Sequence, residues 1–123
     1  MPKKILVVDD KANIVLSLEF LMKQAGYEVR TASDGEEALA TIEADPPDLI
    51  LLDVNMPTKN GFEVCETVRA RNEWSHIRII MLTAHGRDIE REKGLALGAD
   101  DYLTKPFAIR EVVSKVQELL EQS

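Results

Sequence analysis

The chain has 123 residues, of which 45% are hydrophobic and 30% charged, and this composition suits a single globular domain with its own core. Its 22 acidic and 15 basic residues give a formal net charge of −7, which argues against attraction to DNA or to an anionic membrane surface. The first apolar run, residues 5–8, is too short for a secretory or membrane-spanning segment, and the single Cys65 cannot form an internal disulfide. We therefore expect one domain over residues 1–123 of a cytoplasmic protein.

Five short apolar segments along the chain are predicted to be strands. They comprise residues 5–8, 29–32, 49–52, 77–82 and 102–103. The first, third and fourth are almost continuously apolar, which is typical of strands covered on both faces of a parallel sheet.

The segments that follow these strands have apolar residues at helical spacing. The positions are Ile14, Leu18, Leu21 and Ala25; Ala38, Leu39 and Ile42; Phe62, Cys65 and Val68; the apolar residues of 88–97; and Val112, Val113, Val116, Leu119 and Leu120. Gly26 and Gly98 are placed to end the first and fourth of these helices. Strand and helix thus alternate five times, which predicts a parallel sheet with helices on both faces.

Charged and hydroxyl side chains stand where the predicted strands end. Asp9 and Asp10 follow the first strand, Asp53 the third, Thr83 the fourth and Lys105 the fifth. A lone aspartate after a strand is often only a helix cap or a turn residue. The whole set indicates function, because the carboxyl ends of parallel strands meet at one edge of the sheet, where such folds bind ligands. Two unit charges about 4 Å apart repel by roughly 4 kcal/mol at an effective dielectric near 20. Three acids beside one lysine therefore favour a further cation, and oxygen ligands suit Mg²⁺.

Four segments of the sequence resemble the signatures of response regulator receiver domains. They are ILVVDD (residues 5–10), DLILLDVNMP (48–57), MLTA (81–84) and GADDYLTKPF (98–107). The similarity covers nearly the whole chain, in the order and at the spacing of that family. It implies a flavodoxin-like (βα)5 doubly wound α/β fold, whose five-stranded parallel sheet has the order 2-1-3-4-5.

Carried over position by position, the resemblance makes Asp53 the phosphoryl acceptor. It also implies that Asp10, Asp53 and the backbone carbonyl of Asn55 bind Mg²⁺ directly, whereas Asp9 acts mainly through water. Lys105 is expected to pair with a phosphoryl oxygen. These roles agree with the chemistry, since phosphoryl transfer needs an in-line nucleophile and positive charge around the transferred group.

The resemblance further implies a switch controlled by phosphorylation. Thr83 is expected to hydrogen-bond the phosphoryl group, and the ring of Tyr102 to turn inward as Thr83 moves. Pro106 follows the lysine where the family usually has a cis peptide bond. The expected donor is a phosphohistidine of a histidine kinase or phosphotransfer protein. The acyl phosphate is later hydrolysed, so the domain is expected to be a self-resetting phosphoacceptor rather than an enzyme.

Asn55 and His85 stand two residues after the acceptor and the threonine, and in this family these positions flank the path of the attacking water. Histidine is not the commonest residue at the second position. Two interpretations of His85 remain open: an imidazole that partly shields the phosphoryl group and slows hydrolysis, or a solvated loop side chain.

Two surfaces resemble interaction faces of the family. Leu16 and Phe20 lie nearly opposite the apolar face of their helix and are either isolated surface residues or, with Val15, a docking patch for a phosphotransfer helix. The last two helices carry Arg91, Lys93, Glu111 and Lys115, which partly resemble the face through which receivers of winged-helix regulators form phosphorylation-dependent homodimers. That face consists of the fourth helix, the fifth strand and the fifth helix. The segment 94–107 favours an amino-terminal or excised domain of a larger regulator, with any DNA-contacting part elsewhere.

Three other classes of protein fit the residues less well. A flavodoxin-like FMN protein needs a phosphate-binding loop after the first strand, where Asp9 and Asp10 would repel phosphate. A phosphatase of the haloacid dehalogenase type has a second aspartate two residues after its nucleophile, where this chain has Asn55. A pseudo-receiver that has lost phosphorylation would not be expected to keep the complete set of acids, threonine and lysine.

Overall fold

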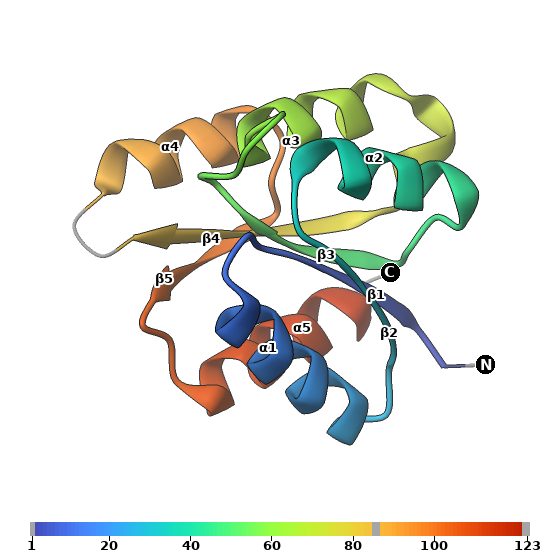
Figure 1. The fold of residues 1–123 in the computed structure, drawn as a ribbon, viewed down its shortest axis with the longest axis vertical. Coiled ribbons are helices and arrows are strands. Elements are labelled where there is room, and N and C mark those ends of the chain that lie inside the picture. Colours follow the sequence, from blue (N-terminus) through green and yellow to red (C-terminus); the bar gives the residue numbers. More distant parts are fainter. Residues whose placement is uncertain (1, 85–86, 122–123) are drawn as a thin grey trace.

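The computed structural model describes residues 2–84 and 87–121. Within these ranges, strands and helices alternate along the chain (Figure 1). In order they are β1 (Lys4–Val8), α1 (Ala12–Gln24), β2 (Glu28–Ala32), α2 (Gly35–Ala44), β3 (Leu49–Asp53), α3 (Gly61–Ala70), a 3-10 helix (Asn72–Trp74), β4 (Arg78–Ala84), α4 (Asp88–Ala96), β5 (Asp101–Lys105) and α5 (Ile109–Glu121). None of the described helices is long and apolar enough to cross a lipid bilayer.

The strands form one parallel sheet in the order β2-β1-β3-β4-β5, which confirms the order that the resemblance implied. Helices α2, α3 and α4 cover one face of this sheet, and α1 and α5 cover the other (Figure 1). The central strands β1 and β3 therefore lie between two helical layers, and their carboxyl ends lie side by side.

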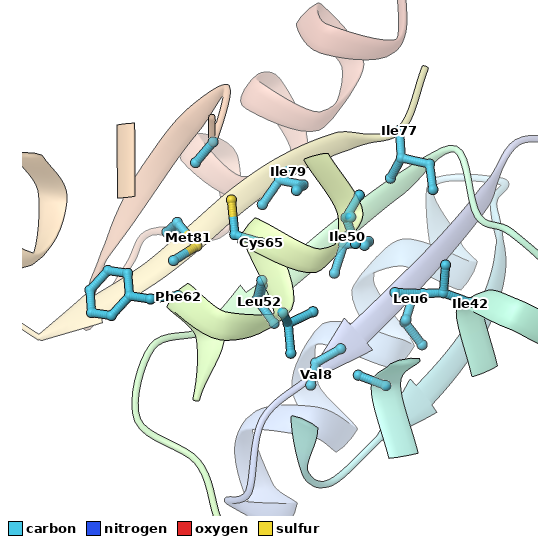
Figure 2. Packing of buried hydrophobic residues seen from close by; sticks show 14 of the residues in the cluster. Leu6, Val8, Ile42, Ile50, Leu52, Phe62, Cys65, Ile77, Ile79 and Met81 are labelled. Carbon is cyan, nitrogen blue, oxygen red and sulfur yellow. The ribbon is translucent and has the colours of Figure 1, made fainter. Parts of the chain in front are cut away.

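Alternate residues of the central strands enter two cores, one on each face of the sheet. In β1, Leu6 and Val8 pack in the core under α2 and α3, which Figure 2 shows, whereas Ile5 and Val7 pack in the core under α1 and α5. Every residue of β3 is buried. Burial on both faces explains the continuous apolar runs, and each fully buried aliphatic side chain contributes about 1.5–3 kcal/mol.

Local signals set the helix ends. The side chain of Asn60 accepts a hydrogen bond from the Glu63 N–H at 3.0 Å, and the Glu63 carboxylate accepts one from the Asn60 N–H at 2.9 Å, so α3 begins with a capping box. Gly26 and Gly98 follow α1 and α4 with φ angles of 96° and 112°, which are left-handed values that glycine adopts readily. The structure thus confirms the prediction that these two glycines end the helices.

The structure also differs from the sequence-based expectations. Strand β5 runs over Asp101–Lys105 rather than 102–103, because only Leu103 in it is fully buried and the apolar signal is correspondingly short. Strand β4 begins one residue later and ends two residues later than predicted. The 3-10 helix at Asn72–Trp74 was not predicted.

Candidate functional site

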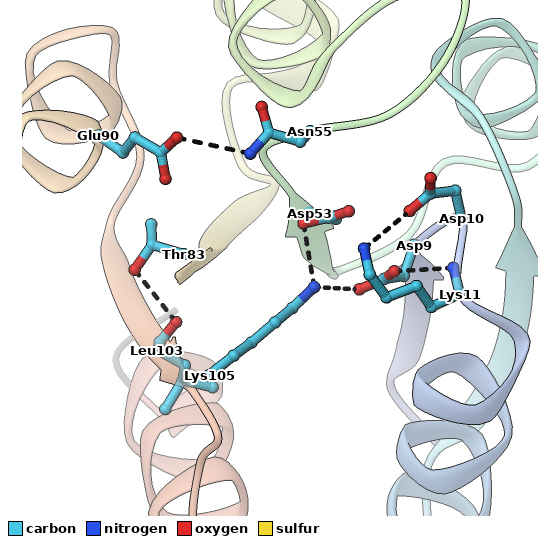
Figure 3. A network of polar contacts seen from close by, with 9 residues as sticks. All are labelled: Asp9, Asp10, Lys11, Asp53, Asn55, Thr83, Glu90, Leu103 and Lys105. Carbon is cyan, nitrogen blue, oxygen red and sulfur yellow. Dashed lines mark hydrogen bonds and ion pairs between the residues drawn. The ribbon is translucent and has the colours of Figure 1, made fainter. Parts of the chain in front are cut away.

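Three carboxylates meet at the carboxyl ends of the two central strands. Asp9 and Asp10 directly follow β1, Asp53 is the last residue of β3, and one carboxylate oxygen from each lies within 4.8 Å of the others (Figure 3). Asp9 is fully buried and Asp53 is 4% exposed, whereas Asp10 is exposed. The structure therefore brings together the acids that the sequence predicted, with one of them open to solvent.

Lys105, the last residue of β5, reaches toward two of these acids. Its Nζ lies 2.8 Å from Oδ2 of Asp9 and 3.1 Å from Oδ1 of Asp53 (Figure 3). The peptide bond between Lys105 and Pro106 is cis, as the resemblance implied. A second ammonium group, that of the exposed Lys11, lies 3.4 Å from Oδ1 of Asp10. Two ammonium groups beside three carboxylates still leave an excess of negative charge at the site.

Burial and neighbouring charges shift the ionisation of the two central groups. Burial, reinforced by the Asp9 carboxylate, raises the pKa of Asp53, although Lys105 opposes the shift. Burial alone would lower the pKa of Lys105, but the hydrogen bonds and charges of Asp9 and Asp53 outweigh it and raise the pKa. The charged form of Asp53 is thus less favourable here than in water, and a second cation beside it would stabilise that form.

The free oxygens of the site suit a hard divalent cation. Within residues 2–84 and 87–121, Oδ2 of Asp53 is buried and has no hydrogen-bond partner. Both oxygens of Asp9 are engaged, one by Lys105 and the other by the N–H of Lys11 at 3.0 Å. The acids with oxygens open to a ligand are therefore Asp53 and Asp10. Since Mg²⁺ binds through one or two carboxylates together with water and phosphate oxygens, the donor set fits this ion.

Thr83 and Tyr102 lie on the neighbouring strands β4 and β5. Thr83 is 1% exposed, and its hydroxyl donates to the carbonyl oxygen of Leu103 over 3.5 Å, at the long end of the hydrogen-bond range. The Tyr102 hydroxyl accepts a hydrogen bond from Arg91 at 3.4 Å, and the guanidinium of Arg91 lies 4.9 Å from the centre of its ring. The predicted switch pair therefore lies on adjacent strands, with Thr83 near the carboxyl end of β4 and Tyr102 near the beginning of β5, where a side chain of α4 holds it.

Asn55 lies in the loop after β3, and its side chain contacts α4. Its Nδ2 donates to Oε2 of Glu90 at 3.5 Å (Figure 3). Glu90 was not predicted as a site residue; its place in the first turn of the helix that follows β4 was the one available signal. His85, the other residue expected to flank the attacking water, lies outside the described residues.

Helix α3 begins unusually close to the acceptor. The Gly61 N–H donates to the Val54 carbonyl at 2.8 Å, and a Cβ on Gly61 would lie only 2.2 Å from the backbone oxygen of Asp53. Real Cβ atoms do not approach backbone oxygens so closely, so glycine allows the helix to pack directly against the strand end that carries Asp53.

The predicted docking residues on α1 line two different hollows. Val15 and Leu16 line a groove of about 440 Å³ that also includes Asp9 and Asp10. Phe20 lines a largely apolar groove of about 490 Å³ between α1 and the segment that connects β5 to α5. Leu16 and Phe20 are 65% and 64% exposed, as their positions opposite the buried face predicted.

The charged residues of the predicted dimer face have mixed surroundings. Lys115 of α5 lies 3.0 Å from Asp101 of β5, and Arg91 of α4 pairs with Asp88. Lys93 instead lies 4.5 Å from the centre of the Phe62 ring of α3. Glu111 is exposed.

A sheet of this order with an acidic cluster and a lysine at its carboxyl edge defines a class of signalling proteins. The sequence model of the response regulator receiver domain matches residues 5–117, and the chain therefore belongs to the receiver domains of two-component response regulators. Proteins of this family act together with histidine kinases.

Individual relatives support this assignment. The chain is 50% identical over all its 123 residues to the alkaline phosphatase synthesis transcriptional regulatory protein PhoP of Bacillus subtilis, and it spans about half (50%) of the length of that protein. It superimposes on a response regulator from Chloroflexus aurantiacus with a TM-score of 0.95 and 40% identity, covering 98% of this chain and 99% of the other. The chemotaxis response regulator CheY4 of Vibrio cholerae matches with a TM-score of 0.90 and 37% identity, covering 97% and 99% of the two chains.

Proposed function

We propose that Asp53 accepts a phosphoryl group from a phosphohistidine of a histidine kinase or phosphotransfer protein, and that its phosphorylation controls a downstream output. The observation that carries this proposal is the burial and the hydrogen bonding of the Asp53 carboxylate. It is buried, its Oδ1 is bound by Lys105, and its Oδ2 is buried without a partner in the described part of the chain.

Mg²⁺ is the cofactor that fits the site. Asp10, Asp53 and the backbone carbonyl of Asn55 would hold it, and Asp9, whose two oxygens are already engaged by protein groups, would contribute through water. When bound, the ion supplies positive charge that offsets the charge of a phosphoryl group beside the carboxylates.

In the transfer, an oxygen of Asp53 bonds to phosphorus while the phosphorus–nitrogen bond of the donor breaks and the ring nitrogen keeps the electron pair. The Lys105 ammonium, 3.1 Å from Asp53, pairs with a phosphoryl oxygen. Hydrolysis of the acyl phosphate releases inorganic phosphate and restores the carboxylate. The domain is thus a phosphoacceptor switch with intrinsic phosphotransfer and autodephosphorylation activity, rather than an enzyme with a separate substrate.

The switch operates through Thr83 and Tyr102. The phosphoryl group adds roughly −1.5 to −2 charges and strong acceptor oxygens. The Thr83 hydroxyl exchanges its long bond to Leu103 for one of these oxygens, because charged acceptors form stronger hydrogen bonds. The ring of Tyr102 then turns inward and leaves its contact with Arg91.

The lifetime of the phosphoryl group is set by the residues that flank the path of water. Asn55 and His85 occupy these positions, and an imidazole at 85 partly shields the phosphoryl group. His85→Ala is then expected to speed up dephosphorylation, and an unchanged decay rate would contradict this role.

The docking surface for the phosphoryl donor includes Val15, Leu16 and Phe20. The exposure of Leu16 and Phe20 on α1, beside the site, supports this role. Leu16→Glu is expected to slow transfer from a donor protein while leaving phosphorylation by acetyl phosphate unchanged. Equal transfer rates for the variant and the wild type would contradict it.

Phosphorylation is further proposed to promote a homodimer through α4, β5 and α5. The charges of Arg91, Asp101 and Lys115 on these elements support an interface that could exchange internal ion pairs for pairs between copies. Sedimentation of the domain with and without phosphorylation tests this, and a monomer under both conditions contradicts it.

The receiver unit comprises residues 1–123 and works in the cytoplasm, without contacting nucleic acid or membrane itself. Its net charge of −7 supports the last point. The output activity would then belong to another domain or a partner protein.

Intact-mass spectrometry after incubation with acetyl phosphate tests the central proposal. The wild type is expected to gain one phosphoryl group only when Mg²⁺ is present, and Asp53→Asn to gain none. A folded, Mg²⁺-binding wild type that gains no phosphoryl group from acetyl phosphate or from a histidine kinase would rule out the proposed chemistry.

A further inference from the structure

Glu90 is a buried carboxylate that none of the steps above uses. It lies in the first turn of α4, and with 8% exposure it belongs with Asp9 and Asp53 among the buried acids of the described chain. Figure 3 shows its side chain directed toward the loop after β3, on the side of Asp53 opposite to Asp9 and Asp10. A buried charge requires partners, and these partners indicate what it does.

Its hydrogen-bonding partners are few. Oε2 accepts from Nδ2 of Asn55 at 3.5 Å and lies 3.1 Å from the guanidinium of Arg87, a side chain that is 61% exposed. Oε1 is buried and has no partner within residues 2–84 and 87–121. Ion pairs with exposed arginines contribute little because water screens them. Among the described residues, the contact with Asn55 is then the specific one, and it ties α4 to the loop that follows the acceptor.

This contact fixes the orientation of the Asn55 amide. An ionised carboxylate can only accept hydrogen bonds, so the amide nitrogen of Asn55 must face Glu90 and its oxygen must face away. While this bond is made, one N–H of the amide is directed to α4, and the amide group is restrained from rotating toward a group on Asp53. Among residues 2–84 and 87–121, Glu90 provides the hydrogen bond that holds the Asn55 amide in this orientation.

We propose that Glu90 is a positioning residue for Asn55, which holds its amide against α4 and thereby shortens the lifetime of phosphorylated Asp53. This inference rests on the proposed phosphorylation of Asp53. When the amide is released, its N–H donates to a phosphoryl oxygen, a stronger acceptor than water, and the side chain then covers the approach of water to phosphorus.

The test is the decay of the phosphorylated domain, followed by intact mass after acetyl phosphate has been removed, in the presence of Mg²⁺. Glu90→Ala is expected to slow the decay about twofold, the factor that corresponds to the lower end of the net strength of a hydrogen bond, because the bond of 3.5 Å is long. In an Asn55→Ala background, the same Glu90→Ala change is expected to have no further effect, because Glu90 acts through Asn55.

Two variants separate the hydrogen bond from the charge. Glu90→Gln retains an oxygen that can accept from Asn55 but carries no charge, and is expected to decay at the wild-type rate. Glu92→Ala removes an equal charge from an exposed position of the same helix, and is also expected to decay at the wild-type rate. If Glu90→Ala does not fold, as judged by its thermal melting curve, Glu90→Met fills the space without providing an acceptor and replaces it.

The inference is overturned if Glu90→Ala decays at the wild-type rate or faster, if Glu90→Gln decays as slowly as Glu90→Ala, or if the effects of the Glu90 and Asn55 changes are additive. The failure of the proposed function looks different. A wild type that takes up no phosphoryl group overturns both the proposed phosphorylation of Asp53 and the role of Glu90. Normal uptake with an unchanged decay rate in Glu90→Ala overturns only the role of Glu90.

Discussion

The acidic residues at the two edges of the sheet have very different surroundings. At the amino ends of the strands, Asp100 accepts a hydrogen bond from the Ile79 N–H at 2.8 Å and pairs with Arg69 at 3.0 Å and with Arg78 at 3.3 Å. Each of its oxygens is therefore engaged by a cationic group, and one of them also by the backbone.

At the carboxyl ends the balance is reversed. Asp9 and Asp53 share the ammonium of Lys105, Asp10 pairs at 3.4 Å only with the exposed Lys11 among the described residues, and Oδ2 of Asp53 has no partner in the described ranges. The comparison indicates that the amino edge stabilises the fold, whereas the carboxyl edge keeps charge and hydrogen-bonding capacity for ligands at the expense of stability.

The largest change in the free energy of unfolding is expected for Asp100→Ala. The substitution removes the acceptor of the buried Ile79 N–H and the partner of Arg69, so it is expected to lower the free energy of unfolding by about 2–3 kcal/mol. Urea denaturation measures this, with Glu118→Ala on the exposed side of α5 as the control. A loss within about 0.5 kcal/mol, the usual range for surface changes, would show that the amino edge is not a stabilising cluster.

The next largest change in the free energy of unfolding is expected when Mg²⁺ binds. Mg²⁺ at ten times its dissociation constant should stabilise the wild type by about 1.4 kcal/mol, since it binds only the folded site. Thermal melting with and without Mg²⁺ measures the gain, and Asp53→Asn should lose most of it. The same gain in the variant would place the ion elsewhere.

A smaller and opposite effect is expected for Asp53→Asn without metal. Removing the buried charge that Asp9 repels should raise the free energy of unfolding by about 1 kcal/mol, even though one contact with Lys105 is weakened. Because the pKa of Asp53 is raised in the folded domain, the folded form binds more protons than the unfolded chain between the two pKa values. The wild type therefore gains stability as the pH falls through this interval, and the advantage of the variant should shrink.

Urea titrations of both proteins at neutral and at mildly acidic pH measure this difference. If Asp53→Asn is less stable than the wild type at neutral pH in the absence of divalent ions, then the acids at the carboxyl edge do not lower the stability of the fold.

The smallest effect on stability is expected for Thr83→Ala. Within the described part of the chain its hydroxyl makes one bond, of 3.5 Å, so the change in the free energy of unfolding should stay below about 1 kcal/mol. By contrast, the structural response of Tyr102 to phosphorylation should be lost, which a fluorine label on Tyr102 would report by NMR. A large loss of stability would mean that Thr83 supports the fold rather than the switch.

The sequence was sufficient for the parts of the structure that depend on patterns along the chain. Continuous apolar runs located β1 and β3, and their ends located Asp9, Asp10 and Asp53, because strand ends in a parallel sheet share one edge. The extent of β5 was missed, since only Leu103 in this strand is fully buried.

Features that depend on side-chain conformation could not be predicted. The sequence does not reveal that the backbone N–H of Lys11 and the ammonium of Lys105 each bind one oxygen of Asp9. Nor does it reveal that Oδ2 of Asp53 has no hydrogen-bond partner among the described residues. Nor does it reveal that Glu90 is buried, because it stands in a helix of mostly charged residues whose periodicity does not single it out.

The contact between Gly61 and the backbone of Asp53 has a consequence for the evolution of the chain. Alanine is a better helix former than glycine, so where a helical glycine is not in close contact with other atoms, its replacement by alanine is readily accepted. Here the added methyl group would push α3 away from the residue that carries the acceptor. Selection for signalling would then preserve glycine at a position without any chemistry of its own, and the helix cannot drift relative to the strand without moving Asp53.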